Sequence, residues 1–325
     1  MTDGSSWITT EECNSFFADR LGNSVMCWIA LLFLLKRRYT MNQFTPTVLP
    51  QQIVTANIAA AKGKTDLPLC RLILLGIFAG MFIACGASAS SVAMHNISNV
   101  GLARFVAGSI FPVGLMMIVF VGGELFTGDC LMIMGCLHGR FPAARMAKVL
   151  TVVFLSNFIG AFVLAALVKA SGQYHYSGDL LGAFTIKVAV GKLNMSFGTA
   201  FASGILCNIF VCIAVLMAAA SKDIGGKVWA IFFPIMAFVV SGYEHCVANM
   251  YYIPAGILAA ADEAYVKAAE AAYGYTAAQF ELLTWGNFVV RNLIPVTLGN
   301  IVGGMVFVGL PLYLIHRAKI RAEEA

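Results

Sequence analysis

The stretch 231–256 reads IFFPIMAFVVSGYEHCVANMYYIPAG, and it is long and apolar enough to cross a bilayer as a helix. Its centre nevertheless holds Glu244 and His245, and ionisable side chains at bilayer depth carry a large desolvation cost. Gly242 precedes this pair and Pro254 ends the run, so we predict that the helix breaks here. Because non-helical backbone at that depth is tolerated only inside protein or beside a water-filled cavity, we expect a pore with His245 at its midpoint.

The composition places the rest of the chain in a membrane as well. Of the 325 residues, 60% are hydrophobic and 11% are charged, whereas soluble globular domains carry about 25% charged residues. The apolar runs are long and do not alternate, which predicts membrane-spanning helices rather than a β-barrel. The net charge of +5 is small, and it fits anchoring at the lipid bilayer surface better than binding to nucleic acid.

Four regions follow from the pattern of apolar runs. Residues 1–40 contain an apolar run that is too short to span a bilayer, and we predict that they form an N-terminal extension outside the fold. Residues 41–68 predict a cytoplasmic amphipathic helix and a linker. Residues 69–315 predict a channel domain of six membrane helices, and residues 316–325 predict a cytoplasmic tail.

We expect the six membrane segments at about 69–94, 103–137, 143–170, 196–220, 228–261 and 285–315. The second is too long for one simple crossing. Basic residues gather before the first segment and after the second, fourth and sixth, which places both termini in the cytoplasm. We therefore expect a multi-pass protein of the cell inner (plasma) membrane.

The two halves of the membrane domain echo each other. GIFAGMFI from Gly76 resembles GILCNIFV from Gly204, and NFIG from Asn157 resembles NIVG from Asn300. VGGELFTG at 121–128 stands where VSGYEH stands at 240–245. Three segments in each half give the halves opposite orientations, and inverted repeats with one broken helix each place a site near the bilayer midplane.

The two breaks carry the residues with pore chemistry. GGELFTGD at 122–129 supplies the hydroxyl of Thr127, and Leu125 and Phe126 beside it are large apolar residues that could narrow a pore. We interpret this stretch as a pore loop. The alternative is a kinked helix in which Glu124 is satisfied locally. Histidine is the side chain whose charge changes near neutral pH, so in a pore His245 could donate a hydrogen bond to an anion or exchange a proton with it. A buried structural histidine is the alternative.

Three further polar residues are candidates. Lys192 lies just before the fourth segment, where a lone base at an outer entrance raises the local anion concentration; an ordinary interfacial lysine fits equally well. Asn208 and Asn300 are amides within spans, and such amides tie helices together or hold loop backbone.

The nine cysteines form no CxxC pair, and the sequence has no P-loop and no HExxH motif. We therefore predict no metal, no cofactor and no enzyme.

Four ordered motifs resemble the formate/nitrite transporter family: FVGGELFTG at 120–128, GILCNIFVCIAV at 204–215, SGYEHCVANMYYIP at 241–254 and NLIPVTLGNIVGG at 292–304. The likeness runs from about Met41 to the C-terminus. It implies an all-α membrane protein with an aquaporin-like protomer. Its six transmembrane helices form two inverted three-helix repeats, the second and fifth helices are broken, and the protomers assemble as a homopentamer.

The resemblance also implies roles for single residues. It makes His245 the central histidine of the pore, Thr127 its hydrogen-bonding neighbour and Lys192 the vestibule lysine. It implies polar support of the broken helices and the pore from Glu244, Asn208 and Asn300. It implies a cytoplasmic-side constriction at Leu125 and Phe126, and a periplasmic-side constriction at Phe111, Leu115 and Phe238, with Ala248 nearby.

Together these observations predict a channel or transporter for small monovalent anions of weak acids. We expect formate, with hydrosulfide or nitrite as alternatives. A bare carboxylate in a low dielectric is strongly disfavoured, so we expect pH-dependent, proton-linked (symporter) passage in which Lys192 attracts the anion and His245 stabilises or protonates it. A neutral-solute channel of aquaporin type is the alternative of another class; it predicts Asn-Pro-Ala at the breaks, and no such tripeptide occurs.

Overall fold

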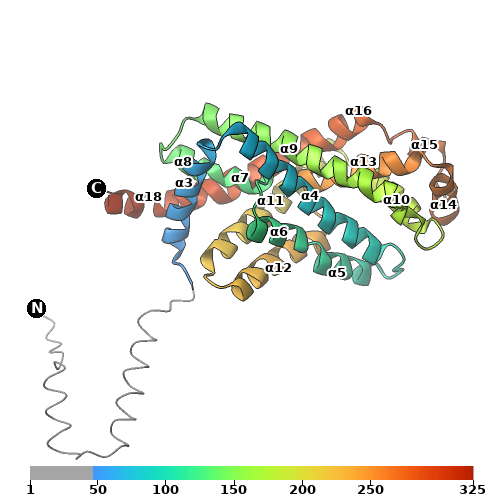
Figure 1. Cartoon of the computed structure of the whole chain (residues 1–325), viewed down its shortest axis with the longest axis horizontal. Helices are drawn as coiled ribbons and strands as arrows, with labels where there is room; N and C mark the ends of the chain where they lie inside the picture. Colours follow the sequence, from blue (N-terminus) through green and yellow to red (C-terminus); the bar gives the residue numbers. More distant parts are fainter. Residues whose placement is uncertain (1–46, 325) are drawn as a thin grey trace, which may run out of the picture. The chain divides into compact units, whose positions relative to one another are not determined.

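The computed structural model describes residues 47–324. In this part of the chain every secondary-structure element is a helix, apart from one isolated β-bridge between Thr47 and Ser221. The extension expected at 1–40 lies outside the described residues. Of the expected cytoplasmic helix region, the structure describes α3 (Pro50–Thr65), which lies at the opposite end of the helical bundle from α14 (Glu263–Tyr273) (Figure 1). We call these the α3 end and the α14 end.

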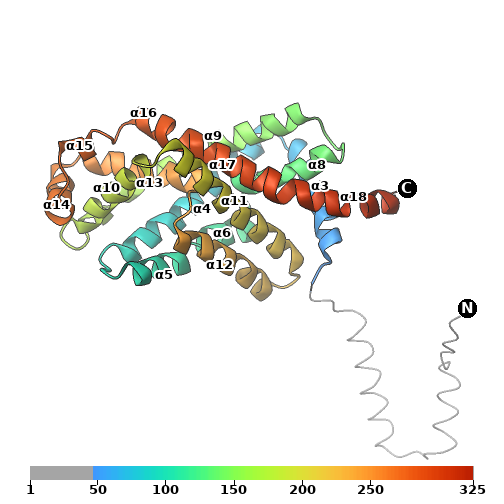
Figure 2. The same cartoon turned by 180° about the vertical axis from the view of Figure 1, so that it is seen from behind.

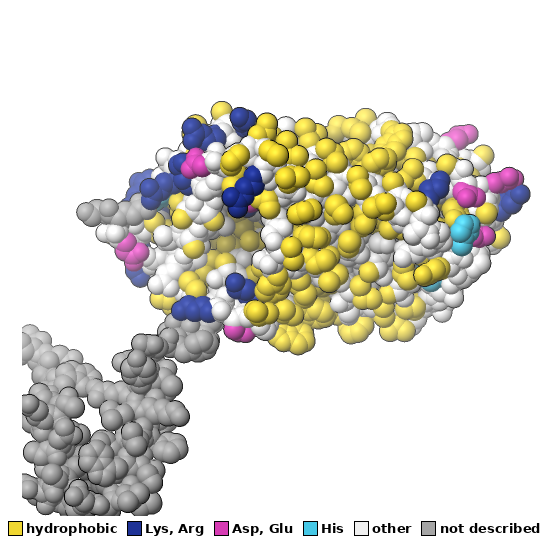
Figure 3. Space-filling model, in the orientation of Figure 1, with side chains coloured by type: hydrophobic (Ala, Val, Ile, Leu, Met, Phe, Trp, Pro, Cys, Tyr) yellow, Lys and Arg dark blue, Asp and Glu magenta, His cyan; other side chains and the backbone are white. Residues whose placement is uncertain are grey.

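Six stretches of the described residues are long and apolar enough to cross a membrane, which confirms the predicted number. Four are single helices: α4 (Leu69–Met94), α9 (Ala143–Ala170), α11 (Phe197–Ala220) and α12 (Ile224–Ser241). The second is α5 (Val100–Ile110) with α6 (Val113–Val121). The last comprises α16 (Trp285–Asn287), η3 (Phe288–Leu293), α17 (Ile294–Val302), η4 (Gly303–Gly309) and α18 (Leu310–Glu324). Hydrophobic side chains cover the middle of the molecule between charged ends (Figure 3).

The second and fifth spans are broken, as predicted. After α6 the chain turns at Gly122 and resumes as α7 (Phe126–Asp129), η1 (Cys130–Met132) and α8 (Ile133–Leu137). After α12 it turns at Gly242 and resumes as α13 (Cys246–Ala260). Both glycines have positive φ, 104° and 73°, which a residue with a Cβ rarely adopts. The expectation that Pro254 ends the run is wrong, because this proline lies inside α13.

Among the described helices, two of more than ten residues, α10 (Leu180–Leu193) and α14, had no counterpart among the six predicted segments. Between the third and fourth spans lies α10, which is too short to cross a membrane and packs against α13. Its position in the second half matches that of α3 in the first, since each precedes the first span of its half. Each also has a lysine in its last turn, Lys64 in α3 and Lys192 in α10. The remaining short elements, η2 (Gln173–His175) and α15 (Ala277–Phe280), lie in connections.

Two asparagines hold the broken helices, and they do so with the same three bonds. The Asn157 Oδ1 accepts from the Phe126 N–H at 3.0 Å, while its Nδ2 donates to the carbonyls of Gly76 at 2.7 Å and Glu124 at 2.9 Å. These bonds supply partners to backbone groups that the break has freed at bilayer depth.

Asn300 repeats this pattern in the second half. Its Oδ1 accepts from the Cys246 N–H at 2.9 Å, and its Nδ2 donates to the carbonyls of Gly204 at 2.8 Å and Glu244 at 3.0 Å. The matching partners show that the two sequence halves are also repeats in three dimensions. Each asparagine therefore ties the last span of its half to both the first span and the break.

Glycines three residues after these asparagines let the helices approach closely. A Cβ added at Gly160 would collide with the Ile77 carbonyl of α4, and one at Gly303 would collide with the Ile205 carbonyl of α11. In Figure 2, α17 runs beside α11. The GxxxG of Gly299 and Gly303 therefore serves a helix contact within the chain.

We expect Asn157→Ala and Asn300→Ala each to lower the free energy of unfolding by about 2 kcal/mol or more, because each leaves one N–H and one carbonyl of a break unpaired at about 1 kcal/mol or more apiece. Denaturant unfolding of the purified protein in detergent measures this. Asn194→Ala is the matched control, since Asn194 is exposed after α10. A change in either buried variant no larger than that of the control would contradict the assigned role.

Candidate functional site

The two breaks meet at a histidine–threonine pair in the middle of the bundle. His245 is the N-cap residue of α13, and Thr127 lies in the first turn of α7. The Thr127 Oγ1 is 2.8 Å from the His245 Nε2, and both side chains are buried. The sequence separates these residues by 118 positions, so only the pairing of the two halves brings them together.

Hydrogen bonds fix the tautomer of His245. The Ala248 N–H donates to the His245 Nδ1 at 3.1 Å, so Nδ1 acts as an acceptor. In the neutral imidazole the other nitrogen then carries the hydrogen, and Nε2 donates it to the Thr127 Oγ1. The hydroxyl hydrogen of Thr127 remains available for another acceptor. Both imidazole nitrogens of His245 are therefore engaged, and a solute that reaches the neutral histidine gains a hydrogen bond by exchanging with Thr127 at Nε2.

Next to this pair lies a narrow apolar gap of about 10 Å³, which is about the space that one water centre occupies. The Phe111 and Phe238 rings meet edge to face there, with centroids 5.5 Å apart. The gap is lined by His245 and by seven apolar residues: Ile83, Phe111, Leu115, Leu125, Val211, Ile235 and Phe238. A solute must lose nearly all of its water to pass.

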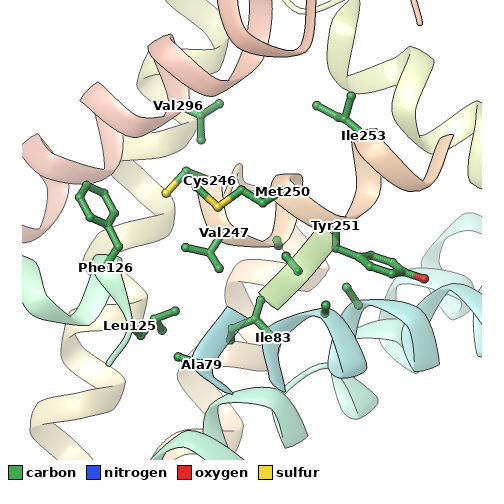
Figure 4. Packing of buried hydrophobic residues seen from close by; sticks show 14 of the residues in the cluster. Ala79, Ile83, Leu125, Phe126, Cys246, Val247, Met250, Tyr251, Ile253 and Val296 are labelled. Atoms are coloured by element: carbon green, nitrogen blue, oxygen red, sulfur yellow. The ribbon is translucent and has the colours of Figure 1, made fainter. Parts of the chain in front are cut away.

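Phe126, which we expected beside Leu125 in the constriction, does not line this gap. Its ring packs edge to face against Phe154 of α9, with centroids 4.9 Å apart. Leu125 and Phe126 point in different directions (Figure 4). Of the two apolar plugs, Leu125 is the one that borders the histidine.

At the α14 end a larger cavity of about 680 Å³ leads towards the same histidine. It is lined by Phe111, Phe238, His245 and Ala248 at its deep end, and by α10, α5 and α14 residues further out. We call this cavity the vestibule. The vestibule is much larger than the gap, so a wide cavity precedes a narrow passage.

A buried ion pair lies in the wall of the vestibule. The Lys192 Nζ donates to the Glu244 Oε1 at 2.8 Å, so Lys192 is not the lone base that we expected. The other carboxylate oxygen accepts from the Asn249 Nδ2 at 2.6 Å and the Asn292 Nδ2 at 3.3 Å. These bonds hold Glu244 while its neighbour His245 faces the passage.

A related cluster lies at the α3 end. The Lys64 Nζ is 2.5 Å from both the Glu124 Oε2 and the Asp129 Oδ1. Burial lowers the pKa of Lys64, but the carboxylates of Asp129 and Glu124 raise it more, so this pKa lies above its ordinary value. Lys64 therefore stays protonated at physiological pH and holds two carboxyl groups at the first break.

Sequence reasoning missed several of these residues, although a signal was present. Asp129 follows Glu124 by five positions, and Asn249 follows Glu244 by five. With the lysines that end α3 and α10, this spacing outlines both clusters. Asn208, which was predicted, donates to the Thr127 carbonyl at 3.1 Å and the Asn300 carbonyl at 2.6 Å and so connects the two breaks.

The described part of the chain holds no group of three or more His, Cys, Asp or Glu side chains that could bind a metal ion. The geometry instead provides a wide vestibule, an apolar gap and one hydrogen-bonding pair. This arrangement suits selective passage of a small solute.

Comparisons with known proteins agree with this arrangement. The family model described as formate/nitrite transporter matches residues 51–314. A probable formate transporter from Methanothermobacter thermautotrophicus is 37% identical over 277 residues, which cover 80% of this chain and 93% of that protein. The formate channel FocA of Haemophilus influenzae is 39% identical over 213 residues, which cover 65% and 73% of the two chains.

Among solved structures, a pentameric formate channel with formate bound matches with a TM-score of 0.68 at 35% identity, and the match covers 76% of this chain and 97% of that one. The family model spans most of the chain, and the relatives align over most of their own length. The chain is therefore an integral membrane protein of the formate/nitrite transporter family, a family of channels and transporters rather than of enzymes.

Proposed function

We propose that this protein carries formate across the membrane, in a passage that depends on protonation of the anion. One observation supports this most directly: His245, which is hydrogen-bonded to Thr127, lines a gap whose other lining residues are apolar. Relatives named as formate transporters and channels supply the choice of formate.

The proposed mechanism follows from the cost of desolvation. The gap excludes the hydration shell of an entering ion, and a bare carboxylate in such a medium is strongly disfavoured. Neutral formic acid crosses more easily, because its one O–H and its carbonyl need only hydrogen-bond partners. At the gap, the Nε2 of His245 can offer such a partner when its hydrogen bond to Thr127 exchanges for one to the acid. Passage then rises as the pH falls and moves one proton with each formate, which makes the protein a formate–proton symporter.

Nitrite and hydrosulfide are the alternative substrates. Both are small monovalent anions of weak acids, so the same argument from desolvation applies to them. The narrowness of the gap favours hydrosulfide as the second candidate, since this ion has a single heavy atom. A neutral-solute channel would instead pass glycerol or water without any anion.

We further propose an inner-membrane homopentamer with the α3 end in the cytoplasm. At the α3 end, Arg140 and Lys222 lie in short connections and Arg145 lies in the first turn of α9, which fits the positive-inside rule. The similar solved channel is pentameric. On α12, Trp229 and Phe233 expose large apolar surfaces that lipid or a neighbouring subunit can cover.

Light scattering of the detergent-solubilised protein tests the assembly. We expect a protein mass of five times the 34.8 kDa chain. A mass of one or two chains would contradict the pentamer, and it would leave the substrate proposal unaffected.

Flux into proteoliposomes tests the substrate and the mechanism. We expect formate uptake to exceed that of nitrite, hydrosulfide and glycerol, and to rise as the pH falls. His245→Ala and Thr127→Val are each expected to lower formate flux about tenfold, because the loss of one hydrogen bond of about 1.4 kcal/mol in the passage changes a rate by that factor.

His245→Asn and Thr127→Ser are the matched controls. Asparagine is a good N-cap residue and can accept from the Ala248 N–H, while serine keeps the hydroxyl. Both should retain most of the flux if a hydrogen bond is what the passage needs. Loss of flux in His245→Asn as severe as in His245→Ala would show that the histidine must itself titrate. Glycerol flux without anion flux would contradict the proposal as a whole.

The gap makes a separate prediction about size selection. Phe238→Ala removes one of the two opposed rings, and we expect it to raise acetate flux relative to formate flux about tenfold. Phe233→Ala is the control, because this ring is exposed on the outside of α12. An unchanged ratio of acetate to formate flux in Phe238→Ala would place the selective constriction elsewhere.

A further inference from the structure

The vestibule at the α14 end contains cations that the ion pair of Lys192 does not account for. Lys192 and Glu244 contact each other at 2.8 Å, and their side chains are 16% and 6% exposed. Opposite charges at that distance cancel most of each other's field beyond a few ångströms. The attraction of an anion to the vestibule therefore needs other groups.

Arg104 is one of these groups. It lies on α5, its side chain is exposed, and its guanidinium rests against Gly242 at the fifth-span break. Within residues 47–324 it makes one hydrogen bond, from Nη1 to the Val240 carbonyl at 3.4 Å. A guanidinium has five N–H donors in a planar fork that matches a carboxylate. Most of these donors remain available beside the vestibule.

Lys187 is the other group. It is exposed on α10, five residues before Lys192, and its Nζ lies 4.3 Å from the centroid of the Tyr273 ring. This cation–π contact orients the ammonium but does not neutralise it. Within residues 47–324, neither Lys187 nor Arg104 forms an ion pair with a carboxylate.

The carboxylate and the outer histidine of the vestibule are already engaged. Glu244 is its one lining carboxylate, and it is paired with Lys192. His95 binds the Val92 carbonyl through Nδ1 and the Ser177 hydroxyl through Nε2. The uncompensated charge of the vestibule thus resides on Arg104 and Lys187, and both line the cavity.

We propose that Arg104 and Lys187 form a carboxylate-capture site in the vestibule, ahead of the gap. This inference rests on the proposed transport of formate and assigns the step before desolvation. Arg104 binds the two carboxylate oxygens in a bidentate manner, and Lys187 adds a point charge. The site concentrates the anion near His245, and Lys192 has the separate role of pairing with Glu244.

The size of the vestibule extends the inference to larger ligands. A cavity of about 680 Å³ holds carboxylates much larger than formate, whereas the gap of about 10 Å³ rejects them. A small dicarboxylate should therefore bind at Arg104 and Lys187 without passing, and should compete with formate from the α14 side only.

Formate uptake by cells that lack their own formate transporters tests the site. Arg104→Gln, Lys187→Gln and the double variant are compared with Lys267→Gln, a control that removes an exposed α14 lysine that does not line the vestibule. We expect the KM for uptake to rise about threefold in each single variant and about tenfold in the double variant at low ionic strength, with the maximal rate unchanged. Added salt should raise the KM of the wild type and leave that of the double variant almost constant, because salt screens exposed charges.

Malonate supplies the second measurement. We expect external malonate to inhibit uptake competitively in the wild type and in Lys267→Gln, and to lose most of its effect in the double variant. An unchanged KM with unchanged malonate inhibition in the double variant would overturn the capture site. A fall in the maximal rate with an unchanged KM would also overturn it, because that result indicates a structural role.

Uptake by the wild-type protein distinguishes a failure of the capture site from a failure of the proposed function. Uptake of nitrite or hydrosulfide in place of formate would show that the substrate proposal is wrong, and the same variants would then be compared with that anion. Normal formate uptake with no effect of the substitutions would retain the proposed function and reject the capture site.

Discussion

The structure depends on supplying partners to backbone groups that two broken helices free at bilayer depth. A membrane interior offers no water for this purpose, so an unsatisfied break would be costly. Asn157 and Asn300 meet the need with one side chain each, because an amide can donate and accept at once. Each bonds to the break of its own half and to the first helix of that half.

The pore site follows from this support. Once both breaks are held open, the first turns of α7 and α13 face each other, and Thr127 comes within 2.8 Å of His245. The histidine serves two purposes there, since Nδ1 caps α13 and Nε2 contacts the threonine. A residue that both ends a break and borders the passage couples the stability of the fold to the chemistry of transport.

The sequence predicted the parts of this arrangement that depend on local pattern. Long apolar runs predicted six spans, and polar residues beside Gly122 and Gly242 predicted both breaks. The partner of Lys192 was not predicted, because Glu244 is distant in sequence and only the packing of α10 on α13 brings them together. The direction of Phe126 depends on Phe154 in another helix, and no periodicity in the second span encodes it. The prediction that Pro254 ends the helix was wrong, because a proline inside a packed helix need not end it.

The repeat also explains how one fold presents unlike charges at its two ends. Lys64 matches Lys192 and Glu124 matches Glu244, yet Asp129 stands where Asn249 stands in the other half. The Lys64 cluster therefore holds two carboxyl groups, whereas the Lys192 cluster holds one carboxyl group and an amide. The two ends thus present different polar groups to a solute, while the asparagine bonds that support the breaks are the same in both halves.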